Sequence, residues 1–409
     1  MIKRHESSPY IILGLTWLVY GSFYLNRLNL APVIPLIMGD LEISHTQIGL
    51  ISTSFFVFYA IVQIPAGYIA DIVGPKKIIT IGAILSSIAN FLFGTGQSLF
   101  HLILFQSLNG LGQSSCWGPS VKLVTNWFPF SQRGRAIGIY ITCVSTFIMI
   151  AYGLSGSLGR YFGWRMSFII PPIILLIVIF FFWWKVEDHP QEKIQVSNAT
   201  IPISQERRLI FVIKHIPLRF TLISYFCLMM IRYSIIIWIP SYLHEVHHLD
   251  VMTAGMLSSV YPIMGLIAHP LGGYVSDVIF KGRRVPLIIF GLSGLSVFTM
   301  FLSQTTSMGW SLFLLGGMGF FDQFMSALYF TFAVDLLPRE TVSTGSSFLN
   351  AGASLGSMLS ISLSGLIIAL FKSYHMLFVI LSLIALIGIL FTAFIKERSN
   401  KIKCSATMR

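Results

Sequence analysis

The sequence predicts an all-α membrane protein in which twelve transmembrane helices form two pseudo-symmetric six-helix bundles. Three observations predict this fold: an apolar composition, a succession of apolar runs long enough to cross a bilayer, and a residue pattern that recurs at a constant offset. Of the 409 residues, 55% are hydrophobic and 10% are charged. Soluble domains carry about 25% charged residues, so the composition excludes a soluble globular protein.

Apolar runs recur along the whole chain, separated by short polar breaks. A transmembrane helix needs roughly 20 mainly apolar residues. We expect spans at 11–38, 47–70, 78–97, 102–125, 136–158, 165–184, 218–243, 251–276, 286–305, 309–336, 343–370 and 375–395. The first run is longer than a signal-peptide core and no obvious small-residue cleavage site follows it, so we expect it to be retained.

The distribution of basic residues indicates how the chain is oriented in the membrane. The chain has 27 Lys and Arg against 15 Asp and Glu residues, a formal net charge of +12, and most of the basic residues lie in segments on the side of the N-terminus. The opposite loops hold only Arg160, Arg165 and Lys372, and the spans hold Arg27, Lys122 and Arg232. This positive-inside pattern predicts a multi-pass plasma-membrane protein with both termini in the cytoplasm. The basic balance therefore does not indicate a nucleic-acid partner.

The second half of the chain repeats the first. Gly67–Asp71 reads GYIAD and recurs as GYVSD at Gly273–Asp277, and Arg27 recurs as Arg232 at nearly the same offset. A constant displacement of this kind indicates duplicated halves. We expect an N-terminal half at 1–185, a cytoplasmic linker at 186–217, a C-terminal half at 218–395 and a cytoplasmic tail at 396–409.

The loop between the second and third spans reads Gly67-x-x-x-Asp71-x-x-Gly74-x-Lys76-Lys77, with a second copy from Gly273 to Arg284. This motif resembles the signature loop of the major facilitator superfamily. The resemblance covers nearly the whole chain and implies the major facilitator fold, which works by alternating access. An acidic residue at a helix end beside a basic turn can cap a neighbouring helix. We expect a conformational latch made by Gly67, Asp71, Gly74, Lys76, Lys77, Gly273, Asp277, Arg283 and Arg284.

Two arginines inside the spans predict an anion site. Ionisable groups within a bilayer are costly and mark functional sites. Because Arg27 and Arg232 occupy matched positions in the two halves, a pseudo-twofold axis would bring them to opposite walls of one cavity. Arginine stays protonated and offers parallel donors that suit phosphate or carboxylate. The expected substrate is a small organic anion.

Other candidates surround these arginines. Tyr20 and Tyr24 share a helix face with Arg27, and Tyr225 shares a face with Arg232, so their hydroxyl groups would suit an oxyanion. Asp322 also lies inside a span. Two roles remain open for it: a carboxylate that couples protons or releases an arginine, or a static group that pairs with Arg232 or makes a polar helix contact.

The sequence around the arginines contains Tyr24-x-x-Arg27, Ile231-Arg232-Tyr233 and the segment from Trp238 to Val246. These elements resemble the organophosphate:phosphate antiporters. It implies that both arginines hold a phosphate group and that Tyr20, Tyr24 and Tyr59 line the cavity. Members of that family often have a Lys where this chain has Gln63, and glycerol-phosphate members have a His where it has Val144.

Gln63, Trp127-Phe128-Pro129 and Phe162-Gly163-Trp164-Arg165 are equally similar to the anion:cation symporters for sugar acids. From the resemblance to the antiporters, we expect exchange of a sugar phosphate or glycerol phosphate for inorganic phosphate. The alternative is proton-coupled symport of a sugar acid or another carboxylate. A membrane sensor of sugar phosphate is the alternative from another class.

Two enzyme motifs are present in the wrong context. His244–His248 matches the H-E-x-x-H zinc-protease pattern, but it lies at the outer end of a span just after Pro240. Gly352–Gly356 matches a nucleophile elbow, which belongs between a strand and a helix. The four cysteines have no metal-ligand spacing. We expect no enzyme activity, no cofactor, no metal and a monomer.

Overall fold

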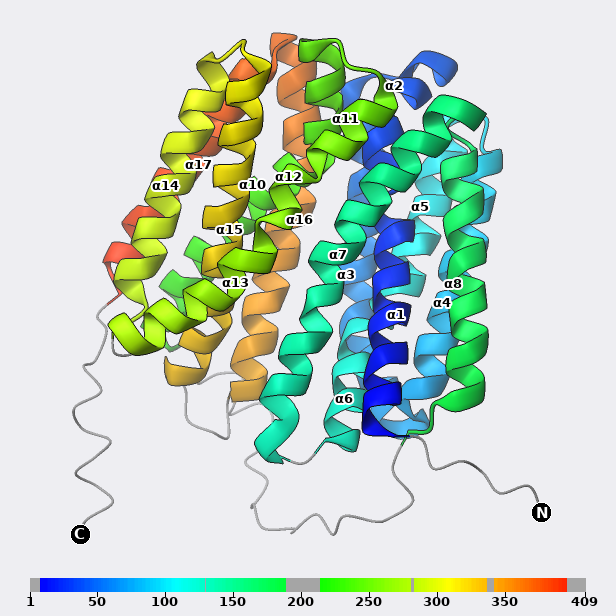
Figure 1. Cartoon of the computed structure of the whole chain (residues 1–409), viewed down its shortest axis with the longest axis vertical. Coiled ribbons are helices and arrows are strands. Elements are labelled where there is room, and N and C mark those ends of the chain that lie inside the picture. The colour runs from blue at the N-terminus through cyan, green and yellow to red at the C-terminus, as the bar shows by residue number, and fades with distance from the viewer. Residues whose placement is uncertain (1–7, 129, 189–213, 281–282, 337–341, 396–409) are drawn as a thin grey trace. The chain divides into compact units, whose positions relative to one another are not determined.

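The computed structural model describes residues 8–128, 130–188, 214–280, 283–336 and 342–395 (Figure 1). These residues are almost entirely helical and contain no strand, which confirms the all-α prediction. The chain forms two compact units, one of Met1–Asn198 with Ile236–Ser259, and one of Ala199–Ile235 with Val260–Arg409. Most of the predicted linker and all of the predicted tail lie outside the described residues.

The first unit contains the helices of the predicted N-terminal half. They are α1 (Pro9–Leu28), α2 (Leu30–Leu41), α3 (His45–Val73), α4 (Pro75–Thr95), α5 (Leu99–Ser114), α6 (Trp117–Trp127), α7 (Phe130–Phe162) and α8 (Met166–Lys185). Helix α1 packs against α7 and α8, and α5 packs between α3 and α4. The unit also includes the outer end of α10 (Ile216–His247) and α11 (Val251–Ser258), which packs against α7. The units therefore differ from the predicted halves at this one segment.

The second unit contains the inner part of α10 and the remaining helices. They are α12 (Val260–Ile263), α13 (Gly265–Tyr274), the π-helical turn η1 (Val275–Ile279), α14 (Val285–Gln304), α15 (Met308–Leu336), α16 (Val342–Phe371) and α17 (Tyr374–Ala393). Helix α14 packs against α15 and α17, and α12 and α13 both pack against α15. This packing brings the helix that carries Asp322 next to the one that carries Gly273.

Each predicted span coincides with one helix or with consecutive helices. Nine helical stretches of the described residues are long and apolar enough to cross a membrane. The three predicted spans outside this set contain α1 and α2, α5 and α6, and α15, which carry Arg27, Gln113 and Asp322. Helices α5 and α6, with 16 and 11 residues, are each too short to cross a membrane alone, because the helix is interrupted between them.

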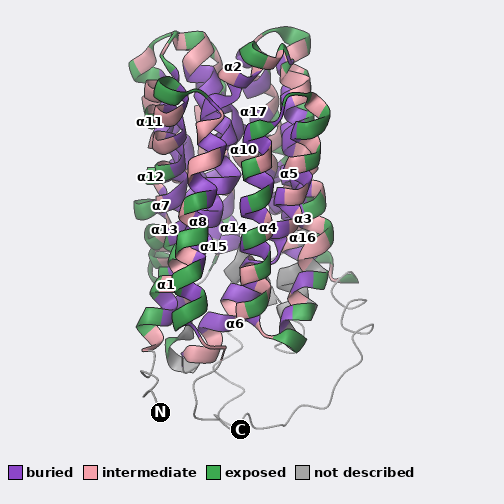
Figure 2. Ribbon diagram, turned by 90° about the vertical axis from the view of Figure 1, so that its right-hand side faces the viewer, coloured by how far each residue is buried: buried purple, intermediate pink, exposed green. Residues whose placement is uncertain are grey.

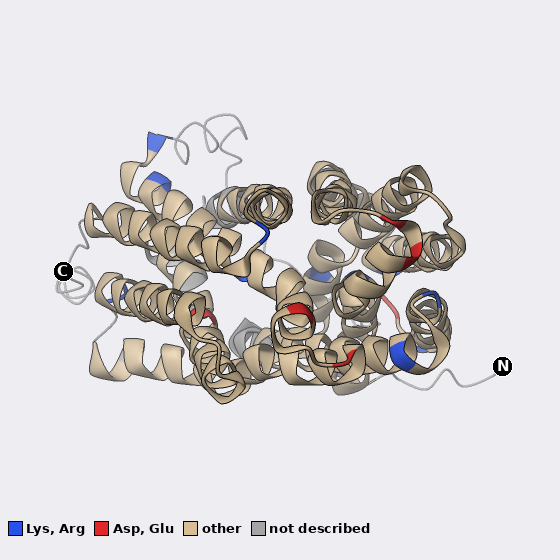
Figure 3. Cartoon of the chain, turned by 90° about the horizontal axis from the view of Figure 1, so that it is seen from above, with Lys and Arg blue, Asp and Glu red and all other residues tan. Residues whose placement is uncertain are grey.

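The helices bury one face and expose another, as Figure 2 shows by alternating buried and exposed positions along each ribbon. Exposed positions carry large apolar residues such as Ile61, Ile177 and Leu390. Apolar side chains on an outer surface suit contact with lipid. Lys, Arg, Asp and Glu are few among the helices (Figure 3), so each buried charge needs an explanation.

In each unit, a glycine in the fourth predicted span of that half sets a close helix contact. In the first unit, Gly110 of α5 lies against the carbonyl oxygen of Phe55 in α3, with no room for a β-carbon. In the second unit, Gly319 of α15 lies against the carbonyl oxygen of Tyr261 in α12 in the same way. Small residues let membrane helices approach closely. These two contacts define matching positions in the two units independently of the sequence repeat.

Helix α10 contains Pro240, which has no backbone N–H to donate to the carbonyl group of Ile236. The hydroxyl group of Tyr152, on α7, donates to that carbonyl oxygen instead. Tyr152 and the outer end of α10 belong to the same unit. A side chain of a neighbouring helix therefore replaces the hydrogen bond that α10 cannot make within itself.

Candidate functional site

Arg27 is buried near the end of α1, with 6% of its surface exposed. Its Nε donates to Oε1 of Gln113, on α5, at 2.9 Å. The guanidinium lies over the rings of Tyr24 and Tyr59, at 4.7 and 4.8 Å from the ring centroids, and 5.4 Å from that of Phe55. Aromatic faces attract a cation, most strongly where water is excluded. Neutral groups thus hold this charge from two sides.

A network of neutral side chains fixes the orientation of Gln113. Its Nε2 donates to Oδ1 of Asn109 at 3.0 Å, which turns its Oε1 toward Arg27. The hydroxyl group of Ser86 donates to the same Asn109 oxygen at 2.7 Å, and Asn109 Nδ2 donates to the carbonyl group of Asn26 at 3.0 Å. A buried network with satisfied members is rigid. The network therefore preorganises Arg27 from α4 and α5.

A small cavity adjoins Arg27 within the first unit. Polar groups reach it from Ser52 and Gln106, and Phe55, Phe56 and leucine side chains supply apolar walls. A cavity with an arginine, an amide and a hydroxyl group offers hydrogen-bond donors to a small polar ligand.

Arg232 lies in α10, in the second unit, and it is held by a carboxylate. Its Nε donates to both oxygens of Asp322 at 2.9 and 2.8 Å, and its NH2 group lies 2.7 Å from Oδ1. The same group donates to the hydroxyl oxygen of Ser326 at 2.6 Å. The side chain of Asp322 is fully buried and that of Arg232 is 14% exposed. Of the two roles predicted for Asp322, the structure shows the pairing with Arg232, and proton coupling stays a prediction.

The two arginine sites are built at matching positions. Gln113 follows Gly110 by three residues, and Asp322 follows Gly319 by three residues, so each arginine partner lies one turn beyond the close helix contact. The ring of Phe55 lies near Arg27, and Tyr261 is in electrostatic range of Arg232. The sequence reasoning missed Gln113, because a neutral amide inside a span carries less signal than a charge.

The predicted tyrosines divide into two groups. Tyr24 and Tyr59 contact Arg27 directly. Tyr20 lies one layer away, stacked on Tyr140 at 5.4 Å and edge-on to Tyr24. Tyr225, in the second unit, packs on Tyr329 with 4.8 Å between ring centroids and is in electrostatic range of Arg232.

Gln63 is half-buried on α3, one turn beyond Tyr59. In the first unit, Tyr24, Tyr59 and Gln113 contact the guanidinium group of Arg27.

The comparisons with known proteins agree with this architecture. The model of the Major Facilitator Superfamily matches residues 16–360. The chain belongs to the major facilitator superfamily. It is therefore a multi-pass membrane transporter and not an enzyme, as the sequence predicted.

Similar proteins cover nearly the whole chain. A "Probable hexose phosphate transport protein" of Chlamydia muridarum is 27% identical to this chain, and the alignment covers 91% of this chain and 87% of the relative. The "Hexuronate transporter" of Bacillus subtilis is 26% identical and covers 84% of each chain. The fold resembles the crystal structure of a bacterial homolog of the human lysosomal transporter Spinster in an inward-facing and occupied conformation. That structure has a TM-score of 0.81 at 18% identity and covers 94% of this chain and 96% of its own.

Asp188, which the sequence reasoning did not include, contacts residues of the predicted latch. Asp188, just after α8, accepts a hydrogen bond from the backbone N–H of Lys76 at 2.7 Å and so caps α4. Gly74 has a positive φ of 99° and leaves no room for a β-carbon beside this carboxylate. Lys76 Nζ lies over the ring of Trp183, whereas Lys77 is exposed.

The other latch residues are less fully described. The side chains of Asp71 and Asp277 lie outside the described part of the structure. Gly67 and Gly273 are half-buried, Arg283 is exposed, and Arg284 directly precedes α14. The role of this set as a latch stays a prediction.

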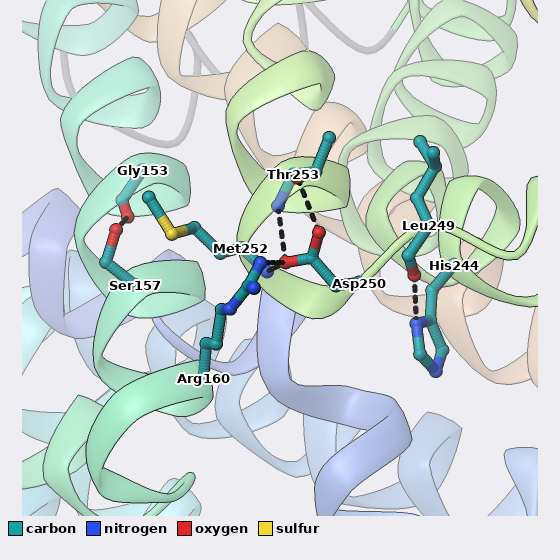
Figure 4. A network of polar contacts seen from close by, with 8 residues as sticks. All are labelled: Gly153, Ser157, Arg160, His244, Leu249, Asp250, Met252 and Thr253. Atoms are coloured by element: carbon teal, nitrogen blue, oxygen red, sulfur yellow. Dashed lines mark hydrogen bonds and ion pairs between the residues drawn. The ribbon is translucent and has the colours of Figure 1, made fainter.

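A polar network at the start of α11 joins it to α7 (Figure 4). Arg160 of α7 lies 2.6 Å from Asp250, which also accepts hydrogen bonds from the backbone amides of Met252 and Thr253. The hydroxyl group of Thr253, the backbone amide of Thr253 and Arg160 together lower the pKa of Asp250 to about 2. His45 of α3 lies 3.2 Å from Glu245 of α10. These contacts hold Ile236–Ser259 in the first unit.

The zinc-protease match does not form a zinc site in the structure. Helix α10 ends at His247, and His248 has a positive φ of 54°, so His244 and His248 do not share a helical face. Nδ1 of His244 is 2.6 Å from the carbonyl oxygen of Leu249 and closes the turn (Figure 4). The motif therefore terminates a helix.

Proposed function

We propose that this protein transports a small organic anion by alternating access, with the anion bound between Arg27 and Arg232. The observation that carries the proposal is the pair of buried arginines at matching positions, each held by the equivalent turn of α5 or α15. Arginine can bind an oxyanion through two parallel hydrogen bonds. Two such groups from two repeats suit an anion that is passed from one side of the membrane to the other.

Exchange of an organophosphate, such as a sugar phosphate or glycerol phosphate, for inorganic phosphate is the first candidate reaction. Support comes from the relative named for hexose phosphate transport and from the aromatic rings that hold Arg27 ready to donate. A phosphate monoester at neutral pH carries about −1.5 to −2 charges, which suits two guanidinium groups.

Proton-coupled symport of a sugar acid or another carboxylate is the second candidate. It is favoured by the relative named for hexuronate transport and by Asp322, a buried carboxylate that can hold a proton. In both cases we propose a plasma-membrane monomer with two halves, 1–185 and 218–395, joined by a cytoplasmic linker and with both termini in the cytoplasm.

Transport by the purified protein in proteoliposomes tests the proposal. Vesicles loaded with radiolabelled phosphate are exposed to external glucose 6-phosphate, glycerol 3-phosphate or glucuronate, with and without a pH gradient. Phosphate efflux that requires an external organophosphate supports exchange. Glucuronate uptake that requires an inward proton gradient supports symport. Binding of glucose 6-phosphate without any flux would identify a sensor, and neither binding nor flux with any probe would overturn anion transport.

A further inference from the structure

His269 lies on α13, in the second unit, and neither the sequence motifs nor the proposed clamp uses it. It is half-buried, and its Nδ1 is 3.0 Å from the carbonyl oxygen of Gly265, one turn earlier. A carbonyl oxygen only accepts hydrogen bonds, so Nδ1 carries the hydrogen. In the neutral ring, Nε2 is then the nitrogen without a proton. Any proton that this imidazole takes up binds at Nε2.

The imidazole belongs to the surroundings of the Arg232–Asp322 pair. Helix α13 packs closely against α15, because Gly272 lies against the carbonyl oxygen of Phe324 with no room for a side chain. His269 precedes Gly272 by one turn and is in electrostatic range of both Arg232 and Asp322. A change of charge on the imidazole therefore alters the electrostatic environment of the Arg232–Asp322 pair.

The repeat assigns His269 a counterpart in the first unit. At the offset of 206 that relates Gly67 to Gly273, His269 corresponds to Gln63. The surroundings match: Ile61 and Ile267 are 64% and 61% exposed, whereas Ala66 and Gly272 are both buried. Gln63 and His269 are both half-buried between them. The same position thus carries a neutral amide in the first unit and a titratable imidazole in the second.

We propose that His269 takes up the proton that accompanies anion binding at Arg232, an inference that rests on the proposed anion site. When the anion accepts hydrogen bonds from Arg232, it competes with Asp322 for the guanidinium. When Arg232 turns its hydrogen bonds to the anion, Asp322 loses part of its contact with a positive charge. An imidazolium at His269 compensates for part of that loss. The only transferred particle is a proton, which moves from solvent to Nε2 when the anion binds and returns when it leaves.

The sign of the linkage follows from this exchange. The complex binds more protons than the free protein, so affinity for the anion rises as the pH falls through the range in which this imidazole titrates. The charged groups in electrostatic range of His269 are Arg232 on α10 and Asp322 on α15. Tyr225 on α10 and Tyr261 on α12 are in turn in range of Arg232. Arginine and tyrosine side chains titrate at about pH 10 or above in water. Asp322 is therefore the one competing proton acceptor of this set.

Substitutions at His269 make two opposite predictions. We expect the affinity of the wild type for glucuronate or glucose 6-phosphate to rise about tenfold from pH 8 to pH 5.5, the effect of a one-unit difference in pKa between free and bound states. In His269→Gln, which copies Gln63, affinity should stay near the weaker, high-pH value. In His269→Lys, a fixed charge should hold it near the tighter, low-pH value. The titration of the phosphate ester itself cancels between variants.

A matched control is available in the same unit. His375 also has its Nδ1 bonded to a backbone carbonyl, that of Ser303 at 2.6 Å, but it is exposed. His375→Gln should bind like the wild type at every pH. Affinities are measured on full-length protein in lipid nanodiscs by calorimetry, and thermal unfolding confirms that each variant is folded.

The outcomes separate the two proposals. Wild-type pH dependence that persists in His269→Gln overturns the role of His269, and its disappearance in Asp322→Asn alone transfers that role to Asp322. A wild type whose affinity does not change with pH also overturns the inference, although the anion site stands. A wild type that binds neither probe overturns the anion site itself, and with it the inference.

Discussion

The two arginine sites share a geometry and differ in charge. Arg27 donates to the amide of Gln113, whereas Arg232 donates to the carboxylate of Asp322, and both partners lie one turn beyond a glycine that touches a neighbouring helix. An anion that binds Arg27 meets a guanidinium whose α5 partner is neutral. An anion that binds Arg232 must compete with a carboxylate already in place. One site is therefore suited to attract the anion, and the other to exchange partners when it arrives.

Removing the arginines should give the largest effects, and unequal ones. Hydrogen bonds to charged groups contribute about 1.5–3 kcal/mol each, so Arg27→Ala and Arg232→Ala should each weaken anion binding by about a hundredfold or more. Arg232→Ala also leaves Asp322 buried without its arginine, at a cost of about 3–5 kcal/mol. Thermal unfolding should therefore show a larger loss for Arg232→Ala.

The double variant Arg232→Ala/Asp322→Ala is the control for this difference. It should recover stability and leave binding lost. Equal unfolding temperatures for the two single variants would contradict the comparison, and wild-type affinity in either would remove that arginine from the site.

Exchanging the partner charges should have the next largest effect. Gln113→Glu makes the first site resemble the second, and we expect anion affinity to fall about tenfold, because one unit of charge now competes for Arg27. Gln113→Met has a similar length and no charge, so it removes the hydrogen bond alone and should weaken binding less. Affinities measured for both variants decide the point: equal losses would mean that charge is not what distinguishes the sites.

The aromatic support of Arg27 should contribute less. Cation–π contacts are worth about 0.5–1 kcal/mol at exposed sites and about 2 when desolvated. Tyr59→Leu should weaken anion binding by up to about tenfold, whereas Tyr59→Phe keeps the ring and should change it by less than about threefold. A large loss in Tyr59→Phe, measured in the same binding assay, would instead assign the hydroxyl group to the ligand.

The exposed pair of Arg160 and Asp250 provides a reference for the buried pair, and its effect should be the smallest. Because Asp250 is 41% exposed, solvent screens the pair. Asp250→Asn keeps the helix cap and should lower the unfolding temperature only slightly. Asp250→Ala also removes the cap, at about 1 kcal/mol, and should lower it further.

The pH dependence of this pair has a defined sign. Its stabilisation is complete above the ordinary pKa of 3.8 and is lost as the pH falls toward the folded value of about 2. The difference in unfolding temperature between wild type and Asp250→Asn should therefore shrink between about pH 4 and pH 2. A difference that grows on acidification would contradict the assignment.

The sequence predicted the fold and the two arginines because both leave strong signals. Apolar runs define the spans, and a charge within a span stands out, as Asp322 did. The partner Gln113 was missed because an amide inside a helix is not unusual by itself. A change in the offset also makes this match hard to see in the sequence. Gly67 and Gly273 are 206 residues apart, whereas Gln113 and Asp322 are 209 apart. The second half therefore has three more residues between Gly273 and Asp322 than the first half has between Gly67 and Gln113.

Other features depend on tertiary structure and leave no local pattern. The break between α1 and α2 falls at Asn29, whose side chain donates to Oδ1 of Asn90 and to the carbonyl group of Ser167. The cap of α4 comes from Asp188, which is 112 residues away from its partner Lys76. Neither pairing could be inferred before the helices were assembled.

The hydrogen bond from Tyr152 to the carbonyl group of Ile236 links hydration to any separation of α10 from α7. If the outer end of α10 separates from α7, this carbonyl loses its donor, and Pro240 cannot supply one. An unsatisfied carbonyl group in an apolar environment costs several kcal/mol. The separation is therefore cheap only where a water molecule takes the place of the hydroxyl group, so hydration of this joint and movement of the helix must occur together.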